Sequence, residues 1–298
     1  MSVSTHITAQ RTTLWAEVAV LGVALIWGAS YPVAKGALTH MPVLLLIFWR
    51  FALAALVMTT VAFRDLRAAG RADLLAGVLL GGILCAIFLA ETWGISMTTA
   101  TNAALIISLC TIFTPFLEFG LRRRLPPAGV MAGATVAVSG VMVLSGGMGA
   151  LGAGDLLILG AAGLRAVMVV STKRLMEGSR LSSAALTAVQ AATVAGLTMA
   201  LLLVQSGRAG LLVSADIGGW ASVAFLSLFC TVGAFYVQNA AVRRTSPTRV
   251  GFLMGTEPLF GFALAWAILS EPATPVALIG AGLIVAGTSL GLAVDRQS

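Results

Sequence analysis

Long apolar runs, separated by short polar segments, fill almost the whole chain. Each run is about 20 residues long, the length that crosses a bilayer, and is apolar on every side, unlike the one-sided helices of soluble proteins. Ten runs lie near 15–36, 43–63, 74–95, 99–120, 127–146, 154–174, 183–205, 217–239, 247–269 and 273–294. The pattern predicts an all-α integral membrane protein with ten transmembrane helices and no soluble domain between them.

Prolines interrupt several of these runs, and two of them recur at a fixed distance. Trp93 and Pro115 are followed 143 residues later by Tyr236 and Pro258. A proline inside a helix removes a backbone hydrogen bond and bends the helix. We therefore predict helix breaks at Pro32, Pro115 and Pro258. A doubled, proline-interrupted segment is typical of a transporter built from two related halves, with its site between them.

If the repeat is real, residues 1–147 and 148–298 each form one five-helix repeat. Five is odd, so the second half would enter the membrane from the opposite face, as in an inverted repeat. The fifth and tenth runs also share two glycines seven residues apart. These are Gly133 and Gly140 in the first half, and Gly280 and Gly287 in the second.

Basic residues alternate between the segments that join the runs. Of 18 lysines and arginines, 14 fall on one predicted face: Arg11, Arg64, Arg67, Arg71, Arg122, Arg123, Arg124, Lys173, Arg174, Arg180, Arg243, Arg244, Arg249 and Arg296. Cytoplasmic loops carry such an excess. The distribution predicts that both termini are cytoplasmic and supports the number of ten spans.

Composition excludes several classes of protein. With 59% hydrophobic and 10% charged residues, the chain is far less charged than a soluble domain, and its net charge of +7 reflects topology rather than nucleic-acid binding. Its three cysteines form no CxxC or Cys/His cluster, so we expect no metal and no cofactor. Walker and HExxH motifs are absent, which argues against an ATP-driven pump and an intramembrane enzyme.

Two charges lie deepest in the predicted spans, Arg165 and Glu257. Ionisable residues inside a membrane are expensive and mark functional sites. One interpretation is that both face a central cavity and bind the carboxylate and ammonium of a zwitterion. The other is that they pair structurally and lock the bundle. Proton coupling, if present, would run through Glu257, Glu91 or Glu118.

Trp27, Tyr31 and Lys35 are spaced four apart and so share one helix face. Trp27 lies at mid-depth, where its ring would stack on an apolar substrate or pack between helices. Four further polar residues would line the cavity or bond between helices: Arg50, Asn102, Ser108 and Gln190.

The stretch Trp27-Gly28-Ala29-Ser30-Tyr31-Pro32-Val33-Ala34-Lys35 resembles the first-helix signature of the drug/metabolite transporter superfamily, in its ten-helix EamA-type branch. Trp49-Arg50-Phe51, Glu257-Pro258 and Glu271-Pro272 resemble further positions of that branch. The resemblance implies an exporter of small metabolites in the bacterial inner membrane, most similar to YddG-type exporters of aromatic and other amino acids. Arg165 departs from the pattern, since a tryptophan is often found there.

Together these features predict a secondary transporter or facilitator that exports amino acids and similar small metabolites by alternating access. The expected partners are a small-molecule substrate and the lipid bilayer, and the oligomeric state stays open. Two other substrate classes remain: lipophilic cations or drugs, which would need an unpaired acid and aromatic groups, and nucleotide sugars or sugar phosphates, which would need several deep basic residues.

Overall fold

The computed structural model describes residues 3–146, 151–207, 216–269 and 274–295. Within these ranges the chain is helical and contains no strand. Its elements are α1 (Val3–Gly28), α2 (Ser30–Ala37), α3 (Val43–Val61), α4 (Phe63–Ala68), α5 (Arg71–Met97), α6 (Ala100–Ile107), α7 (Cys110–Gly120), α8 (Ala128–Leu144), α9 (Ala153–Leu175), α10 (Ser183–Ser206), α11 (Ile217–Ser227), the π-helix η2 (Leu228–Gly233), α12 (Ala234–Arg244), α13 (Pro247–Met254), α14 (Glu257–Leu269) and α15 (Pro275–Asp295).

Eight helical stretches among the described residues are long and apolar enough to cross a membrane, two fewer than the ten predicted. They are Leu14–Ala37, Val43–Val61, Arg71–Met97, Ala100–Gly120, Ala153–Leu175, Ser183–Ser206, Ile217–Arg244 and Pro275–Asp295. The fifth predicted span is α8, which has only 17 residues. The ninth is divided into α13 and α14, of 8 and 13 residues, neither of which reaches the required length alone.

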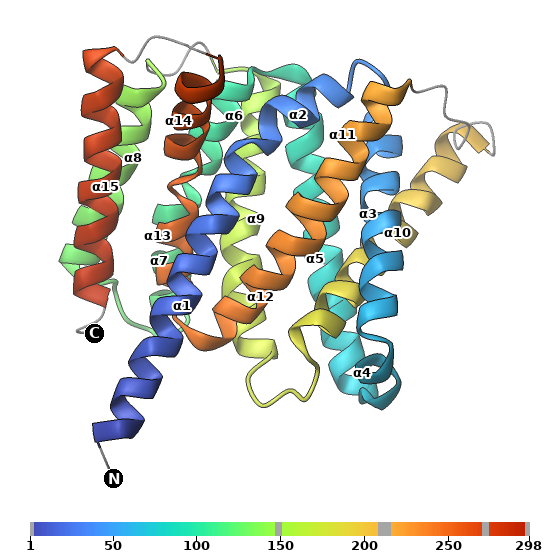
Figure 1. Ribbon diagram of the computed structural model, residues 1–298, viewed down its shortest axis with the longest axis horizontal. Helices are drawn as coiled ribbons and strands as arrows, with labels where there is room; N and C mark the ends of the chain where they lie inside the picture. Colours follow the sequence, from blue (N-terminus) through green and yellow to red (C-terminus); the bar gives the residue numbers. More distant parts are fainter. Residues whose placement is uncertain (1–2, 147–150, 208–215, 270–273, 296–298) are drawn as a thin grey trace.

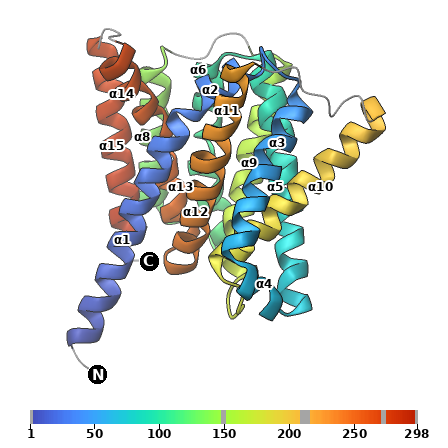
Figure 2. The same ribbon diagram turned by 45° about the vertical axis from the view of Figure 1, so that its right-hand side comes forward.

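The helices form one bundle, with the pairs α3–α10, α5–α9 and α8–α15 packed along one another. Figure 1 shows α8 and α15 together at one edge of the bundle, and Figure 2 shows α10 leaning outward at the opposite edge. The beginning of α1 and the end of α15 lie on the same side of the bundle as α4 and the loop between α9 and α10 (Figure 1). The basic residues at the ends of these elements therefore lie on the side where the described chain begins and ends.

Glycines set the close approach of α8 and α15. A Cβ atom on Gly133 would lie 2.6 Å from the backbone nitrogen of Gly291, and one on Gly140 would lie 2.6 Å from that of Ile284. Small residues let helix backbones meet in lipid, where dispersion replaces the hydrophobic drive to associate. The glycine pairs noted in the fifth and tenth runs thus serve this helix contact.

Three membrane helices are broken, each at a short non-helical step. The steps are Ala29 between α1 and α2, Ser108–Leu109 between α6 and α7, and Gly255–Thr256 between α13 and α14. Pro32 and Pro258 lie in the first turns after two of the breaks. Pro115 lies inside α7, several residues beyond the break at Ser108, so the prediction that it marks the break is wrong.

Hydroxyl groups, rather than prolines, are the feature that the three breaks share. Each hydroxyl donates to the carbonyl three residues earlier: Ser30 to Trp27 at 2.8 Å, Ser108 to Leu105 at 2.6 Å and Thr256 to Leu253 at 2.6 Å. A backbone carbonyl freed in the membrane must find an internal donor. A local side chain supplies that donor here, which is how Ser and Thr compete with regular helix.

Candidate functional site

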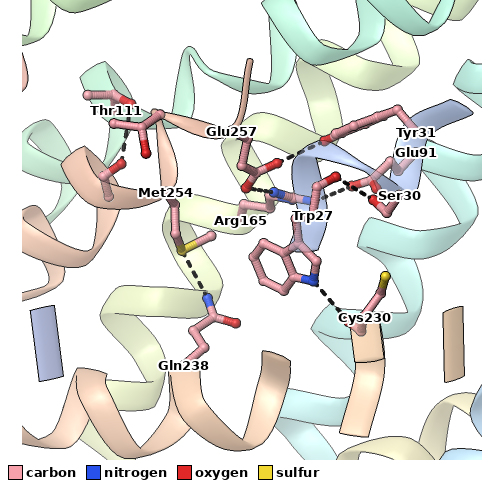
Figure 3. A network of polar contacts seen from close by, with 12 residues as sticks. Trp27, Ser30, Tyr31, Glu91, Thr111, Arg165, Cys230, Gln238, Met254 and Glu257 are labelled. Carbon is pink, nitrogen blue, oxygen red and sulfur yellow. Dashed lines mark hydrogen bonds and ion pairs between the residues drawn. The ribbon is translucent and has the colours of Figure 1, made fainter. Parts of the chain in front are cut away.

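A buried group of charges lies between the two halves of the chain. Arg165 of α9 donates from Nη1 to Glu257 Oε1 at 3.1 Å and from Nη2 to Glu91 Oε2 at 3.0 Å. The three side chains are 11%, 3% and 8% exposed, respectively. Figure 3 shows the guanidinium between the two carboxylates. Because each carboxylate takes a different nitrogen, one guanidinium joins α5, α9 and α14 at the centre of the bundle.

Glu257 is the first residue of α14, directly after the break at Gly255–Thr256. The N-terminus of a helix presents free N–H groups and a partial positive charge, which favour a carboxylate. The hydroxyl of Tyr31 also donates to Glu257, at 3.4 Å. The break thus positions an acid inside the bundle with an arginine and a phenol directed at it.

Trp27 forms the wall below the charges (Figure 3). The guanidinium of Arg165 lies 5.0 Å from its ring centroid, and Phe235 lies 5.1 Å away on α12. Its indole Nε1 donates to the carbonyl of Cys230 at 2.9 Å. Cys230 belongs to η2, and π-helical turns of this kind occur frequently at functional sites. The predicted neighbours Trp27, Tyr31, Arg165 and Glu257 are therefore brought together.

Arg50 lies next to this group on the far side of Phe88. Its Nε donates to Thr231 Oγ1 at 2.8 Å, and its guanidinium lies 4.5 Å from the centroid of Phe88. The residue is 7% exposed. Within the described part of the chain, no carboxylate lies within ion-pair distance of it. Arg50 is thus a second buried cation, linked to the central group through Phe88, which also lines the cavity beside Trp27 and Arg165.

A small cavity adjoins Trp27 and Arg165. Its volume is about 10 Å³, enough for roughly one water molecule. The lining residues are Trp27, Leu84, Ile87, Phe88, Arg165, Met168, Phe235, Gln238 and Met254. Among the described residues, the amide of Gln238 donates only to the sulfur of Met254, at 3.4 Å, and sulfur is a weak acceptor. In this conformation the site is closed around its own side chains.

The sequence names Glu91 only as a route for proton coupling, and of the nine residues that line the cavity it singles out two, Trp27 and Arg165. Glu91 falls near the end of its apolar run, where a charge is ordinary, and only its partner Arg165 reveals its role. Nothing in the sequence distinguishes the lining residues Phe88, Phe235, Gln238 and Met254, because apolar residues and single amides occur throughout such spans.

Lys35 lies apart from the central group, although its spacing from Trp27 and Tyr31 placed it on the same face. Tyr31 and Lys35 both lie on α2, after the break at Ala29, and Lys35 is one turn farther from Trp27. Lys35 Nζ donates to the carbonyls of Ile95, at 3.0 Å, and Thr98. A cation at a helix C-terminus satisfies the last carbonyls, so Lys35 caps α5.

The remaining candidates lie outside the central group. Asn102 is half-buried at the start of α6, where its backbone N–H meets the capping hydroxyl of Thr99 at 3.0 Å. The Ser108 hydroxyl serves its own helix break. Gln190 accepts from Asn239 at 2.8 Å, between α10 and α12. Glu271 and Pro272, the second Glu-Pro pair noted in the sequence, lie outside the described residues.

Further polar contacts lie toward the basic side of the bundle. Glu118 accepts from the backbone N–H and hydroxyl of Thr248 at 2.8 and 2.7 Å. Arg249 forms ion pairs with Glu17 and with Asp295, the second at 3.7 Å. These contacts tie the short helix α13 to α7, α1 and α15.

Named relatives cover most of the chain. It is 29% identical, over 281 residues, to a "Probable amino-acid metabolite efflux pump" of Salmonella typhimurium, an alignment that spans 89% of this chain and 90% of the relative. It is 27% identical to an "Uncharacterized transporter" of Archaeoglobus fulgidus over 91% of this chain and 84% of the relative. A "Probable terminal-alkyne amino-acid exporter" of Streptantibioticus cattleyicolor is 26% identical over 66% of each.

A solved structure titled "Crystal structure of protein" shares the fold, with a TM-score of 0.77, 19% sequence identity, and coverage of 95% of this chain and 98% of that one. The profile described as "EamA-like transporter family" matches the sequence twice, over residues 14–146 and 152–292. Its members are transporters, so the chain is a multi-pass membrane transporter and not an enzyme. It belongs to the EamA-like transporter family.

Proposed function

We propose that this protein exports amino acids, aromatic or otherwise apolar, and similar small metabolites by alternating access around the central charged group. The observation that carries the proposal is Arg165 bridging Glu91 and Glu257 against the ring of Trp27. Such a group offers an acid to an ammonium, a guanidinium to a carboxylate and an aromatic wall to a side chain. The names of two relatives, an amino-acid metabolite efflux pump and an amino-acid exporter, support the same class of substrate.

The net charge of the buried central residues favours a zwitterionic substrate over nucleotide sugars and lipophilic cations. Arg50 and Arg165 match Glu91 and Glu257, so the four buried groups are neutral when ionised. A neutral zwitterion keeps that balance as it enters. A nucleotide sugar would bring uncompensated negative charge, and a lipophilic cation would bring uncompensated positive charge, into a site that excludes water.

A competition experiment tests the substrate class. Proteoliposomes that take up labelled phenylalanine are challenged with excess leucine, tetraphenylphosphonium or UDP-glucose. Inhibition by leucine alone is the expected result. Inhibition by tetraphenylphosphonium or by UDP-glucose, without inhibition by leucine, would assign the site to that class instead.

We further propose ten spans in two inverted repeats, 1–147 and 148–298, with α8 and the joined α13–α14 added to the eight longer stretches. Contacts between helices support this arrangement. Exchanging the halves converts the contact of α5 with α9 into that of α12 with α1, and leaves the pairs α3–α10 and α8–α15 unchanged. Lys35 caps α5, and Lys173, its counterpart, donates to Arg243 at the end of α12, at 3.2 Å.

We place both termini in the cytoplasm and the protein in the bacterial inner membrane, because the basic ends of the helices gather on one side. Labelling by a membrane-impermeant thiol reagent checks this. In intact cells, Thr39→Cys should be labelled and Arg180→Cys protected, and both should react after lysis. Both positions are exposed, and the three native cysteines are buried. The reverse pattern would invert the topology.

Trp27 should select for aromatic substrates. Aromatic pairs contribute about 0.5–1.5 kcal/mol beyond burial, which is roughly a 2- to 10-fold effect. Trp27→Ala is therefore expected to lower the ratio of phenylalanine to alanine flux by that factor. Trp266→Ala is the matched control, since Trp266 is 57% exposed on the surface of the bundle. An unchanged ratio of phenylalanine to alanine flux in Trp27→Ala would mean that Trp27 only packs between helices.

A further inference from the structure

Arg165 connects acids that belong to the two halves, and its two partners differ in how firmly they are placed. Glu91 lies on α5, which packs along α9 over much of its length. Glu257 lies on α14, directly after a helix break. The guanidinium uses separate nitrogens for the two carboxylates. Arg165 can therefore release Glu257 while it remains bound to Glu91.

The closed conformation leaves no room for a substrate beside Arg165. The cavity next to Arg165 has a volume of about 10 Å³, room for about one water, and no amino acid fits it. Both carboxylates are nevertheless paired and nearly inaccessible, at 8% and 3% exposure. A buried carboxylate without a partner strongly destabilises the state that contains it. The arginine is what lets the site close with nothing bound.

We infer that Arg165 is a resident counter-ion that takes the place of the substrate's ammonium group at Glu257 whenever the carrier is empty. Substrate entry transfers Glu257 from the guanidinium to the ammonium, while Glu91 keeps Arg165 in position. Substrate release reverses the exchange, so that the empty carrier closes with its charges satisfied. The protein is then a uniporter, which needs neither a counter-substrate nor a coupled ion to return. The inference rests on the proposed function and specifies its mode of transport.

Neutralising Arg165 should affect two kinds of flux unequally. In Arg165→Gln the empty site would close on two unpaired carboxylates, which slows the return of the empty carrier. Exchange of one substrate for another avoids the empty closed state and should persist. Breaking a buried pair has a large effect, so we expect net flux to fall by about 10-fold or more relative to exchange.

The test compares efflux of labelled phenylalanine from proteoliposomes into buffer without substrate and into buffer with unlabelled phenylalanine. For the wild type the two rates should agree within about threefold, as expected when the empty carrier closes with its charges paired. For Arg165→Gln only efflux into unlabelled substrate should remain. Arg165→Lys keeps the charge and should retain net flux. Arg165→Gln/Glu257→Gln removes the one of the two unpaired acids that the substrate would neutralise, and should raise the ratio of net flux to exchange above that of Arg165→Gln, at lower substrate affinity.

Several outcomes overturn the inference. A wild type that carries phenylalanine only in exchange contradicts it and leaves the proposed function standing. Equal loss of both fluxes in Arg165→Gln, from protein as thermally stable as the wild type, contradicts it as well. If Arg165→Gln does not fold, a low ratio of net flux to exchange in Arg165→Lys, which keeps the positive charge, contradicts the inference instead. A wild type that moves no amino acid in either format overturns the proposed function itself.

Discussion

Replacing Glu257 by glutamine is expected to lower phenylalanine flux by about 10- to 100-fold. A hydrogen bond to a charged group is worth about 1.5–3 kcal/mol, and each 1.4 kcal/mol is a factor of about ten. The substitution removes the acid that would receive the substrate's ammonium. Arg165 Nη1 lies 3.1 Å from Glu257 Oε1. The amide oxygen of glutamine can still accept this hydrogen bond, so the bundle should remain assembled. Initial uptake into proteoliposomes over a range of concentrations measures the effect.

Glu177→Gln is the matched control for this experiment. Glu177 is exposed in the loop after α9, away from the central group. Its replacement should leave flux unchanged. If Glu257→Gln also transports at the wild-type rate, Glu257 only locks the bundle, and the structural interpretation of its pair with Arg165 is the correct one.

Gly28→Val should destabilise the protein more than other substitutions on α1. A Cβ on Gly28 would lie 2.7 Å from the carbonyl oxygen of Glu257 and 2.9 Å from the backbone nitrogen of Gly261. Backbone atoms of α14 cannot move aside as a side chain can. Overpacking is destabilising by about 1–3 kcal/mol, and at about 2–4 °C per kcal/mol the upper value lowers the thermal transition by about 6–12 °C.

Gly22→Val tests whether this effect is steric rather than a general effect of β-branching. Gly22 lies on the same helix, and a Cβ there meets nothing within 4 Å. Detergent-solubilised variants are heated, and the fraction that remains monodisperse is measured by size-exclusion chromatography. Equal transition temperatures for the two variants would mean that α1 and α14 do not approach as closely as the structure has them.

Much of the fold could be predicted from apolar length alone. The run predicted at 183–205 is α10 (Ser183–Ser206), and that predicted at 127–146 is α8 (Ala128–Leu144). A bilayer requires this length, so the signal survives without knowledge of tertiary contacts. The breaks were harder to predict. Pro115 is accommodated inside α7, whereas hydroxyl groups at Ser30, Ser108 and Thr256 accompany the actual breaks.

The site was predictable where a charge had no other explanation. Arg165 and Glu257 are too deep to be interfacial, so their pairing with each other or with a substrate was foreseeable. Glu91 was hidden by its place near the end of a run, because depth along the sequence ignores the length and tilt of α5. The place of Lys35 is harder to predict, because the spacing rule gives a shared face but not a shared depth: Lys35 lies on α2 with Tyr31, one turn farther from Trp27, and reaches the end of α5 instead.

Uptake of labelled phenylalanine into proteoliposomes, with and without an imposed pH gradient, tests the central claim most directly. The wild type should transport without the gradient, with protein-free liposomes as the baseline and Glu257→Gln strongly reduced beside it. Such a result would establish an amino-acid carrier that works through the Glu91–Arg165–Glu257 group. Absence of uptake by folded wild-type protein under both conditions would contradict the account.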